Sequence, residues 1–210
     1  MERPPARCAG SVRFADDAVV MCSSRQQAEA ALARLRAVLA ELGLELKAAK
    51  TKIVHLTENG DGLDFLGFHH RWVRSPGRMG AKGVAFLGRW PADKAMQHTR
   101  DQIRELTDRR RTLLRGETVV GDINRFLRGW AGYFRYGNSA VRFNKIRNYA
   151  VMRLAGFIAK KHRRFRAFGR RVIFTSANQL GLIRLDGTVI APRPFRAWRV
   201  VPNAGGERRR

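Results

Sequence analysis

The sequence predicts an α+β protein in which a strand-rich N-terminal part with one helix precedes a three-helix bundle. In the first ninety residues, short apolar runs alternate with clusters of turn residues, which is typical of antiparallel strands. After Trp90-Pro91 the apolar residues recur every three or four positions, which is the helical period. With 210 residues, of which 44% are hydrophobic, the chain can bury a core as one ordinary domain or two small ones.

The first elements are a β-hairpin and a helix. Apolar residues in 11–22 flank Asp16 and Asp17, which we expect at the tip of the hairpin. By itself this pair indicates only a surface turn, because aspartate is common in turns. Ser24 and Gln27 then have the spacing of a capping box, and apolar residues at helical spacing predict an amphipathic helix over about 25–42.

Three further strands are expected before the helical part. A short β-run covers 53–56, a longer strand covers 65–73, and a return strand covers 84–87. Glycine-rich turns separate them at 58–62 and 75–83.

The bundle begins at Pro91, which suits the first turn of a helix that we expect to reach about Arg111. A second helix ends near Gly137, and a third follows Ser139. Further on, an Asp-Gly turn predicts a short C-terminal β-hairpin within 182–190. The predicted domains are 1–89 (strands and one helix), 90–170 (the bundle) and 171–210 (the hairpin and a basic tail).

The charge of the chain indicates the class of partner. Lys and Arg number 42 against 17 Asp and Glu, a net charge of +25, which is far from that of a typical metabolic enzyme. Such a field favours a polyanion, nucleic acid first and an anionic membrane surface second. Because no apolar run approaches 18 residues, we expect no membrane-spanning segment.

The positive charge is concentrated in the helical part. The 63 residues from Ile123 to Leu185 contain 15 Lys and Arg and no acidic residue, whereas a solvated face normally mixes signs. Within 160–171, cations alternate with Phe165 and Phe168, which could stack on unpaired bases or pack in the core. The candidate RNA-binding residues are Arg125, Arg128, Lys160, Lys161, Arg163, Arg164, Arg166, Arg170 and Arg171.

Cysteine content and the first residues bear on the compartment. The chain has two cysteines, Cys8 and Cys22, so a thiolate zinc site is not expected. The first eight residues have no apolar stretch of the kind that a secretory leader requires. We therefore expect a cytoplasmic protein.

Taken in order, these motifs resemble a known family. Over about 11–160 the chain resembles the C-terminal half of a group II intron reverse transcriptase and maturase. The segment 14–17 (Phe-Ala-Asp-Asp) resembles the catalytic box of the polymerase palm, and 43–51 resembles the motif that follows it. The segment 65–68 (Phe-Leu-Gly-Phe) resembles the primer-grip strand, and 123–134 resembles the thumb or maturase-specific domain. The fold implied is a truncated palm followed by a thumb/maturase bundle.

The resemblance implies a role for particular residues. Asp16 and Asp17 would be catalytic ligands of Mg²⁺, since nucleotidyl transfer uses carboxylates to hold two divalent ions, and Asp16 is the stronger candidate. Lys50 would stabilise the leaving pyrophosphate or act as a general acid; its alternative is a solvated lysine. The primer-grip residues would be Phe65, Leu66, Gly67 and Phe68, with the glycine allowing close approach to the primer backbone; their alternative is sheet core.

One departure from the family limits the expected activity. A complete member carries fingers, early palm strands and a further metal-binding aspartate before the box, whereas ten residues precede Ser11 here. Whether the chain is an enzyme is therefore left open: we expect it to bind intron RNA, and a DNA primer in the complete protein, without polymerase activity alone. It could be a gene fragment, or a partner chain could supply the missing palm. The alternative is a free-standing RNA-binding maturase module that acts in splicing with its palm remnant as scaffold.

Overall fold

The structure is a computed structural model that describes residues 10–58, 60–75, 83–175 and 181–190. Its elements confirm the predicted α+β class. In chain order they are β1 (Gly10–Phe14), β2 (Asp17–Met21), α1 (Arg25–Glu41), β3 (Leu63–Phe65), β4 (Phe68–Arg74), β5 (Ala85–Pro91), α2 (Asp93–Leu106), a 3-10 turn η1 (Arg109–Arg111), α3 (Gly116–Phe134), α4 (Ala140–Lys161) and α5 (Arg166–Thr175).

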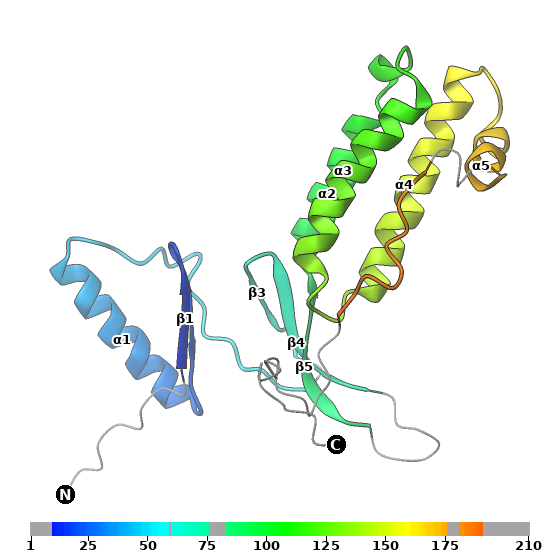
Figure 1. Cartoon of the computed structure of the whole chain (residues 1–210). Helices are drawn as coiled ribbons and strands as arrows, with labels where there is room; N and C mark the ends of the chain where they lie inside the picture. The colour runs from blue at the N-terminus through cyan, green and yellow to red at the C-terminus, as the bar shows by residue number, and fades with distance from the viewer. Residues whose placement is uncertain (1–9, 59, 76–82, 176–180, 191–210) are drawn as a thin grey trace, which may run out of the picture.

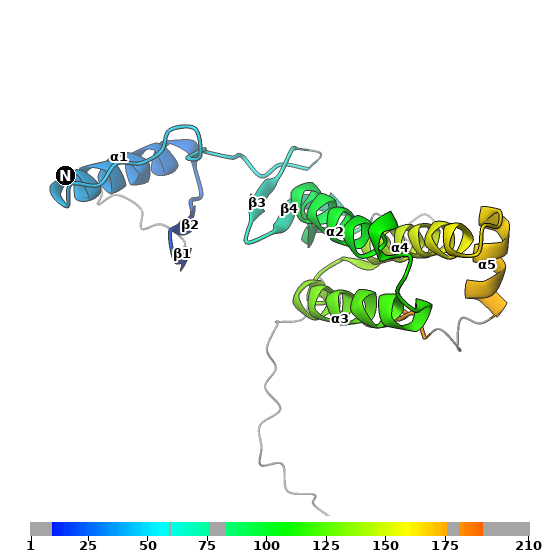
Figure 2. The ribbon, with the colours of Figure 1, turned by 90° about the horizontal axis from the view of Figure 1, so that it is seen from above.

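The predicted first hairpin and helix are confirmed. Strands β1 and β2 pair antiparallel around a two-residue turn, Ala15-Asp16. The hydroxyl of Ser24 accepts a hydrogen bond from the backbone N–H of Gln27 at 3.2 Å and so caps α1. Figures 1 and 2 show the hairpin and α1 set apart from the other elements. None of the residues of α1 is buried.

The second sheet differs from its prediction at two places. Strands β3, β4 and β5 form an antiparallel meander, and Leu66-Gly67 is the turn between β3 and β4 rather than the middle of a strand over 65–73. Both turn residues have a left-handed φ, 49° and 74°, which matches a tight two-residue hairpin. The predicted strand over 53–56 is wrong, because none of the described segments pairs with these residues.

The predicted role of Pro91 is also wrong. Pro91 ends β5, which is longer than the expected 84–87, and pairs with Phe68 of β4. Because β5 is an edge strand of this sheet, a proline without an N–H is tolerated there. Helix α2 begins two residues later, at Asp93.

The three expected bundle helices are present, with α2 ending at Leu106, short of the expected Arg111 (Figure 2). The core lies between them, and residues at the predicted helical spacing fill it. On α3 and α4 every predicted core position is buried: Ile123, Leu127, Trp130, Phe134, Phe143, Ile146, Ala150, Leu154 and Phe157. Of the described helices, none is long and apolar enough to span a membrane.

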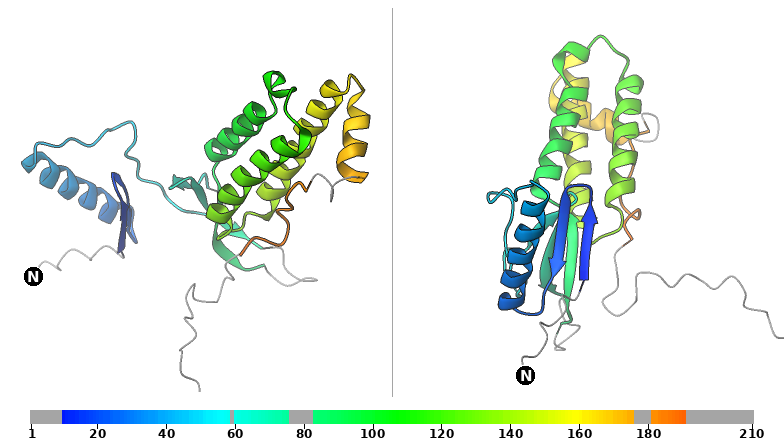
Figure 3. Two further views of the ribbon diagram at one scale, coloured as in Figure 1. Left: turned by 45° about the horizontal axis from the view of Figure 1, so that its top comes forward. Right: turned by 90° about the vertical axis from the view of Figure 1, so that its left-hand side faces the viewer.

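The predicted C-terminal β-hairpin is not found. Residues 166–175 form a fourth helix on the bundle, α5, and 181–190 contain the Asp186-Gly187 turn without strand pairing (Figure 3). Backbone groups of this segment form hydrogen bonds with the bundle instead. The side chain of Asn124 on α3 donates to the carbonyl of Gly181 at 2.6 Å and accepts from the N–H of Ile183 at 2.8 Å. The expected basic tail beyond residue 190 lies outside the described residues.

Candidate functional site

The two aspartates lie at the tip of the first hairpin. Asp16 is the second turn residue, and Asp17 is the first residue of β2, opposite Phe14. Both are exposed, and among the described residues neither carboxylate has a hydrogen-bond or ion-pair partner. Two such carboxylates suit Mg²⁺, a hard cation that is commonly held by one or two carboxylates together with phosphates and water.

The remaining ligands of a two-metal site are not supplied nearby. No group of three or more His, Cys, Asp or Glu that could hold a metal occurs within the part of the chain that the structure describes. Asp16 and Asp17 therefore do not form a complete two-metal site with the other described residues, and their role as Mg²⁺ ligands stays a prediction.

Lys50 is not brought to the aspartates by a direct contact. It lies exposed in a turn at 48–50, and its backbone N–H donates to the carbonyl of Lys47 at 2.9 Å. In the described structure it forms no hydrogen bond or ion pair with Asp16 or Asp17. Its assignment to the leaving group stays a prediction.

The predicted primer-grip segment forms part of the contact between the second sheet and the bundle. The ring of Phe68 lies 4.9 Å from that of Phe134 and 5.6 Å from that of Tyr133, both on α3. The hydroxyl of Tyr133 donates to the carbonyl of Leu66 at 2.8 Å. These contacts fix the β3–β4 turn on the bundle.

Gly67 is favoured in this turn by its backbone conformation. Its φ is 74°, in the left-handed region that glycine adopts readily. A Cβ at this position would meet the ring of Phe134 at 3.4 Å, an ordinary van der Waals contact, so space alone does not require glycine. Its predicted contact with a primer backbone stays a prediction.

The candidate RNA-binding residues lie on two parts of the bundle. Arg125 and Arg128 are exposed on α3, and the others surround the connection between α4 and α5. Lys161 is bonded to the backbone of the bundle, because its Nζ donates to the carbonyls of Thr112 and Leu114 at 2.9 Å each. It ties the α2–α3 loop to the end of α4, a structural role that the sequence alone does not indicate.

The two phenylalanines of the basic segment have different roles. Phe165 is 88% exposed, at the start of α5. Phe168 packs against the core, with its ring 5.9 Å from that of His162. Phe165 is therefore available to stack on a base, whereas Phe168 is engaged in core packing.

Backbone strain coincides with the predicted sites. Only three non-glycine residues of the described chain have a positive φ: Ala15, Leu66 and Arg163. One precedes Asp16, one lies in the predicted primer grip, and one lies in the basic segment. Such conformations cost roughly 1–2 kcal/mol per residue, and they cluster at functional sites.

Arg163 shows this most clearly. It occupies the left-handed position just after the C-cap of α4, where the backbone N–H of Arg164 donates to the carbonyl of Ala159 at 2.8 Å. Glycine is the usual residue there. Arginine at this position is therefore less favourable for stability than glycine would be.

One ionisable group lies between the sheet and the bundle. Burial lowers the pKa of His70, and the charge of Arg89 acts in the same direction. On the opposite face of the sheet, Asp64 and His69 are hydrogen-bonded at 2.6 Å. Burial and the charge of Arg89 therefore both favour the neutral form of His70.

Comparisons with known proteins agree with this arrangement. Residues 7–88 match a family model described as reverse transcriptase (RNA-dependent DNA polymerase). Residues 96–173 match one described as group II intron, maturase-specific domain. A comparison with curated proteins gave no match. Together, the two family matches, in this order along one chain, show that it belongs to the group II intron reverse transcriptase and maturase family.

Proposed function

We propose that the chain binds group II intron RNA through the bundle, as part of an RNA-directed DNA polymerase and maturase that assists splicing. The observation that carries the proposal is the acid-free stretch from Ile123 to Leu185, which coincides with most of the maturase-specific match. Its exposed cations can neutralise phosphates, and Phe165 can stack on a base. The strained backbone of Arg163 supports the same assignment, since folding alone would favour glycine there.

The proposal gives the hairpin tip a second role, metal binding, which depends on further ligands. Asp16 and Asp17 would hold Mg²⁺, which stabilises the charge that develops when a nucleotide is joined to a DNA primer on an RNA template. Within the described residues they lack a third carboxylate partner. We therefore propose RNA binding as the activity of this chain alone, and polymerisation as an activity of an assembly that completes the site.

RNA binding is tested best with Arg163→Gly. This substitution removes one cation and relieves the left-handed strain, so the free energy of unfolding should stay unchanged or rise by about 1 kcal/mol. Binding to intron RNA should weaken, and the slope of log K against log salt should become less steep by about 0.7–0.9. The matched control is Lys94→Gln, one exposed cation at the start of α2. Wild-type binding that is insensitive to salt would contradict the proposal.

The proposed role of Asp16 and Asp17 in polymerisation is tested by primer extension on an RNA template with Mg²⁺. The chain alone should give no extension, and Asp16→Ala should bind RNA as tightly as the wild type. Robust synthesis that Asp16→Ala abolishes would show instead that this chain forms a complete active site.

A further inference from the structure

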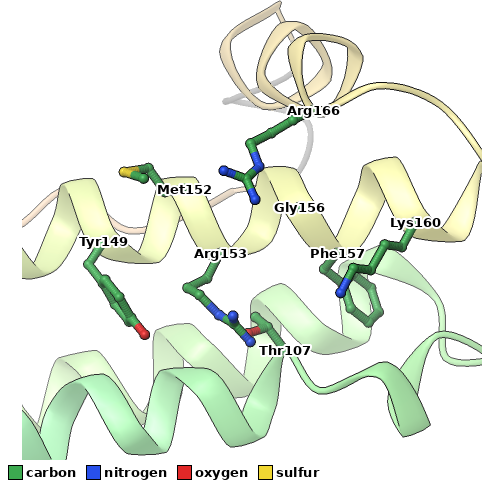
Figure 4. Close-up of a pocket in the computed structure, with 8 residues that line it drawn as sticks. All are labelled: Thr107, Tyr149, Met152, Arg153, Gly156, Phe157, Lys160 and Arg166. Carbon is green, nitrogen blue, oxygen red and sulfur yellow. The ribbon is translucent and has the colours of Figure 1, made fainter.

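A groove crosses the outer surface of α4, between the end of α2 and the start of α5 (Figure 4). Its volume is about 120 Å³. Small-molecule sites typically have roughly 300–1,000 Å³, so this groove suits a single compact group. The lining residues are Thr107, Tyr149, Met152, Arg153, Gly156, Phe157, Lys160 and Arg166.

Three cations line the groove, two from α4 and one from α5. Arg153 and Lys160 belong to α4, and Arg166 is the first residue of α5. Figure 4 shows Arg166 reaching toward α4 beside Gly156, and Arg153 pointing to Thr107. None of the eight lining residues is acidic, so the groove is positive over its whole length.

Arg153 is held in place by the protein. Its Nε donates to the hydroxyl of Thr107 at 3.1 Å, and its Nη2 donates to the carbonyl of Arg104 at 3.3 Å. These two bonds fix the plane of the guanidinium and leave Nη1 for a ligand. A cation oriented in this way binds an anion without first losing side-chain freedom.

Gly156 keeps the floor of the groove open. A Cβ at this position would have Arg166 Nε, at 4.0 Å, as its nearest neighbour. The glycine is within α4 and has no positive φ, so neither backbone conformation nor crowding requires it. Glycine in the interior of a helix lowers stability, so the floor of the groove stays open at a small cost.

The carboxylate of Asp108, which interacts with Arg153, lies outside the lining. Its pKa is lowered chiefly by the backbone N–H of Arg110, with a smaller contribution from the charge of Arg153. Its hydrogen bond to that N–H at 2.9 Å holds it at the start of η1. The positive charge of the groove therefore remains largely uncompensated.

We propose that this groove is a phosphate-binding site for an RNA strand, with Arg153, Lys160 and Arg166 as its ligands. The inference rests on the proposed RNA-binding function and adds where one phosphate is bound. It also adds Arg153, which composition alone did not single out, to the binding residues.

The main test variant is Gly156→Glu, compared with Gly156→Gln. Both side chains fit the helix, and both raise its propensity, so the fold is retained. The glutamate places a negative charge on the groove floor and should weaken binding of a single-stranded RNA oligomer by about tenfold relative to the glutamine. Arg166→Gln should reduce the salt slope by about 0.7. The control is Lys94→Gln, roughly 20 Å away along α2.

A second measurement separates this proposal from the function on which it rests. Inorganic pyrophosphate is titrated into the full chain while the backbone amide signals of Arg153, Gly156 and Lys160 are followed by NMR. Saturable shifts at these amides, lost in Gly156→Glu, would support the groove even if the chain failed to bind RNA. Normal RNA binding in Gly156→Glu and Arg166→Gln, with no shifts at these amides, would overturn the groove and leave the RNA-binding function intact.

Discussion

The two parts of the molecule that carry the predicted chemistry differ in how they are held. The hairpin and α1, residues 10–41, contain no buried residue, and Phe14 beside the aspartates is 65% exposed. The second sheet and the bundle share a continuous core in which Phe143, Ile146 and Leu154 are almost completely buried. A two-stranded hairpin is only marginally stable in water by itself.

This difference separates the two functions physically. The aspartates lie on a part of the chain that has no buried residue, whereas the cations that we propose to bind RNA lie on the packed helices of the bundle. Placement of metal ligands to within a fraction of an ångström requires rigidity, and RNA phosphates tolerate more freedom. RNA binding by this chain is therefore expected to be independent of the hairpin.

The largest expected effect tests the contrast with the same substitution in both parts. Leu154→Ala should lower the free energy of unfolding by about 2–5 kcal/mol, because Leu154 is fully buried in the bundle. Leu35→Ala in α1, at a site that is 38% exposed, should lower it by less than about 1 kcal/mol. Urea denaturation followed by far-UV circular dichroism, which reports all the helices, measures both. Equal losses would show that α1 folds cooperatively with the bundle and would break the comparison.

An intermediate effect tests whether α5 belongs to the packed bundle. A Cβ at Gly169 would lie 2.0 Å from the carbonyl oxygen of Ala155, so α5 and α4 touch through their backbones. Gly169→Ala should therefore destabilise by about 1–3 kcal/mol.

The matched change is Gly129→Ala on α3, where a Cβ meets nothing within 4 Å. This substitution should stabilise by about 0.5–1 kcal/mol. Thermal unfolding distinguishes the two; a neutral Gly169→Ala would mean that α5 is not docked in solution.

The smallest effect concerns pH and the contact between sheet and bundle. The folded-state pKa of His70 is lowered by burial, so the unfolded state binds more protons as the pH falls. The contribution of neutral His70 to the free energy of unfolding should be fully present above about pH 6.5, the pKa of histidine in the unfolded state. It should decline as the pH falls from there toward the folded-state pKa. His70→Gln should flatten this part of the profile, whereas His98→Gln, at an exposed position of α2, should keep the wild-type shape.

Much of the bundle could be predicted because its signal is local. Ile123, Leu127, Trp130 and Phe134 fall on one side of a helix through their spacing alone, and all four are buried. The Ser24 cap follows equally from neighbouring residues. The prediction failed where an element depends on a distant partner. Residues 53–56 have a strand-like pattern but no pairing strand in the described chain, and 182–190 pack on α3 instead of on themselves.

For the candidate sites, the sequence by itself determined the chemistry: adjacent aspartates at a hairpin tip, an acid-free run of cations, and the family to which their order belongs. The tertiary structure decided which of these groups remain available to a ligand. It bonded Lys161 to two loop carbonyls, packed Phe168 against the core while exposing Phe165, and brought Arg153, Gly156 and Arg166 to the lining of one groove. Residue type and helical spacing are local properties, whereas burial, hydrogen-bond partners and the convergence of charges arise only when separate helices pack together.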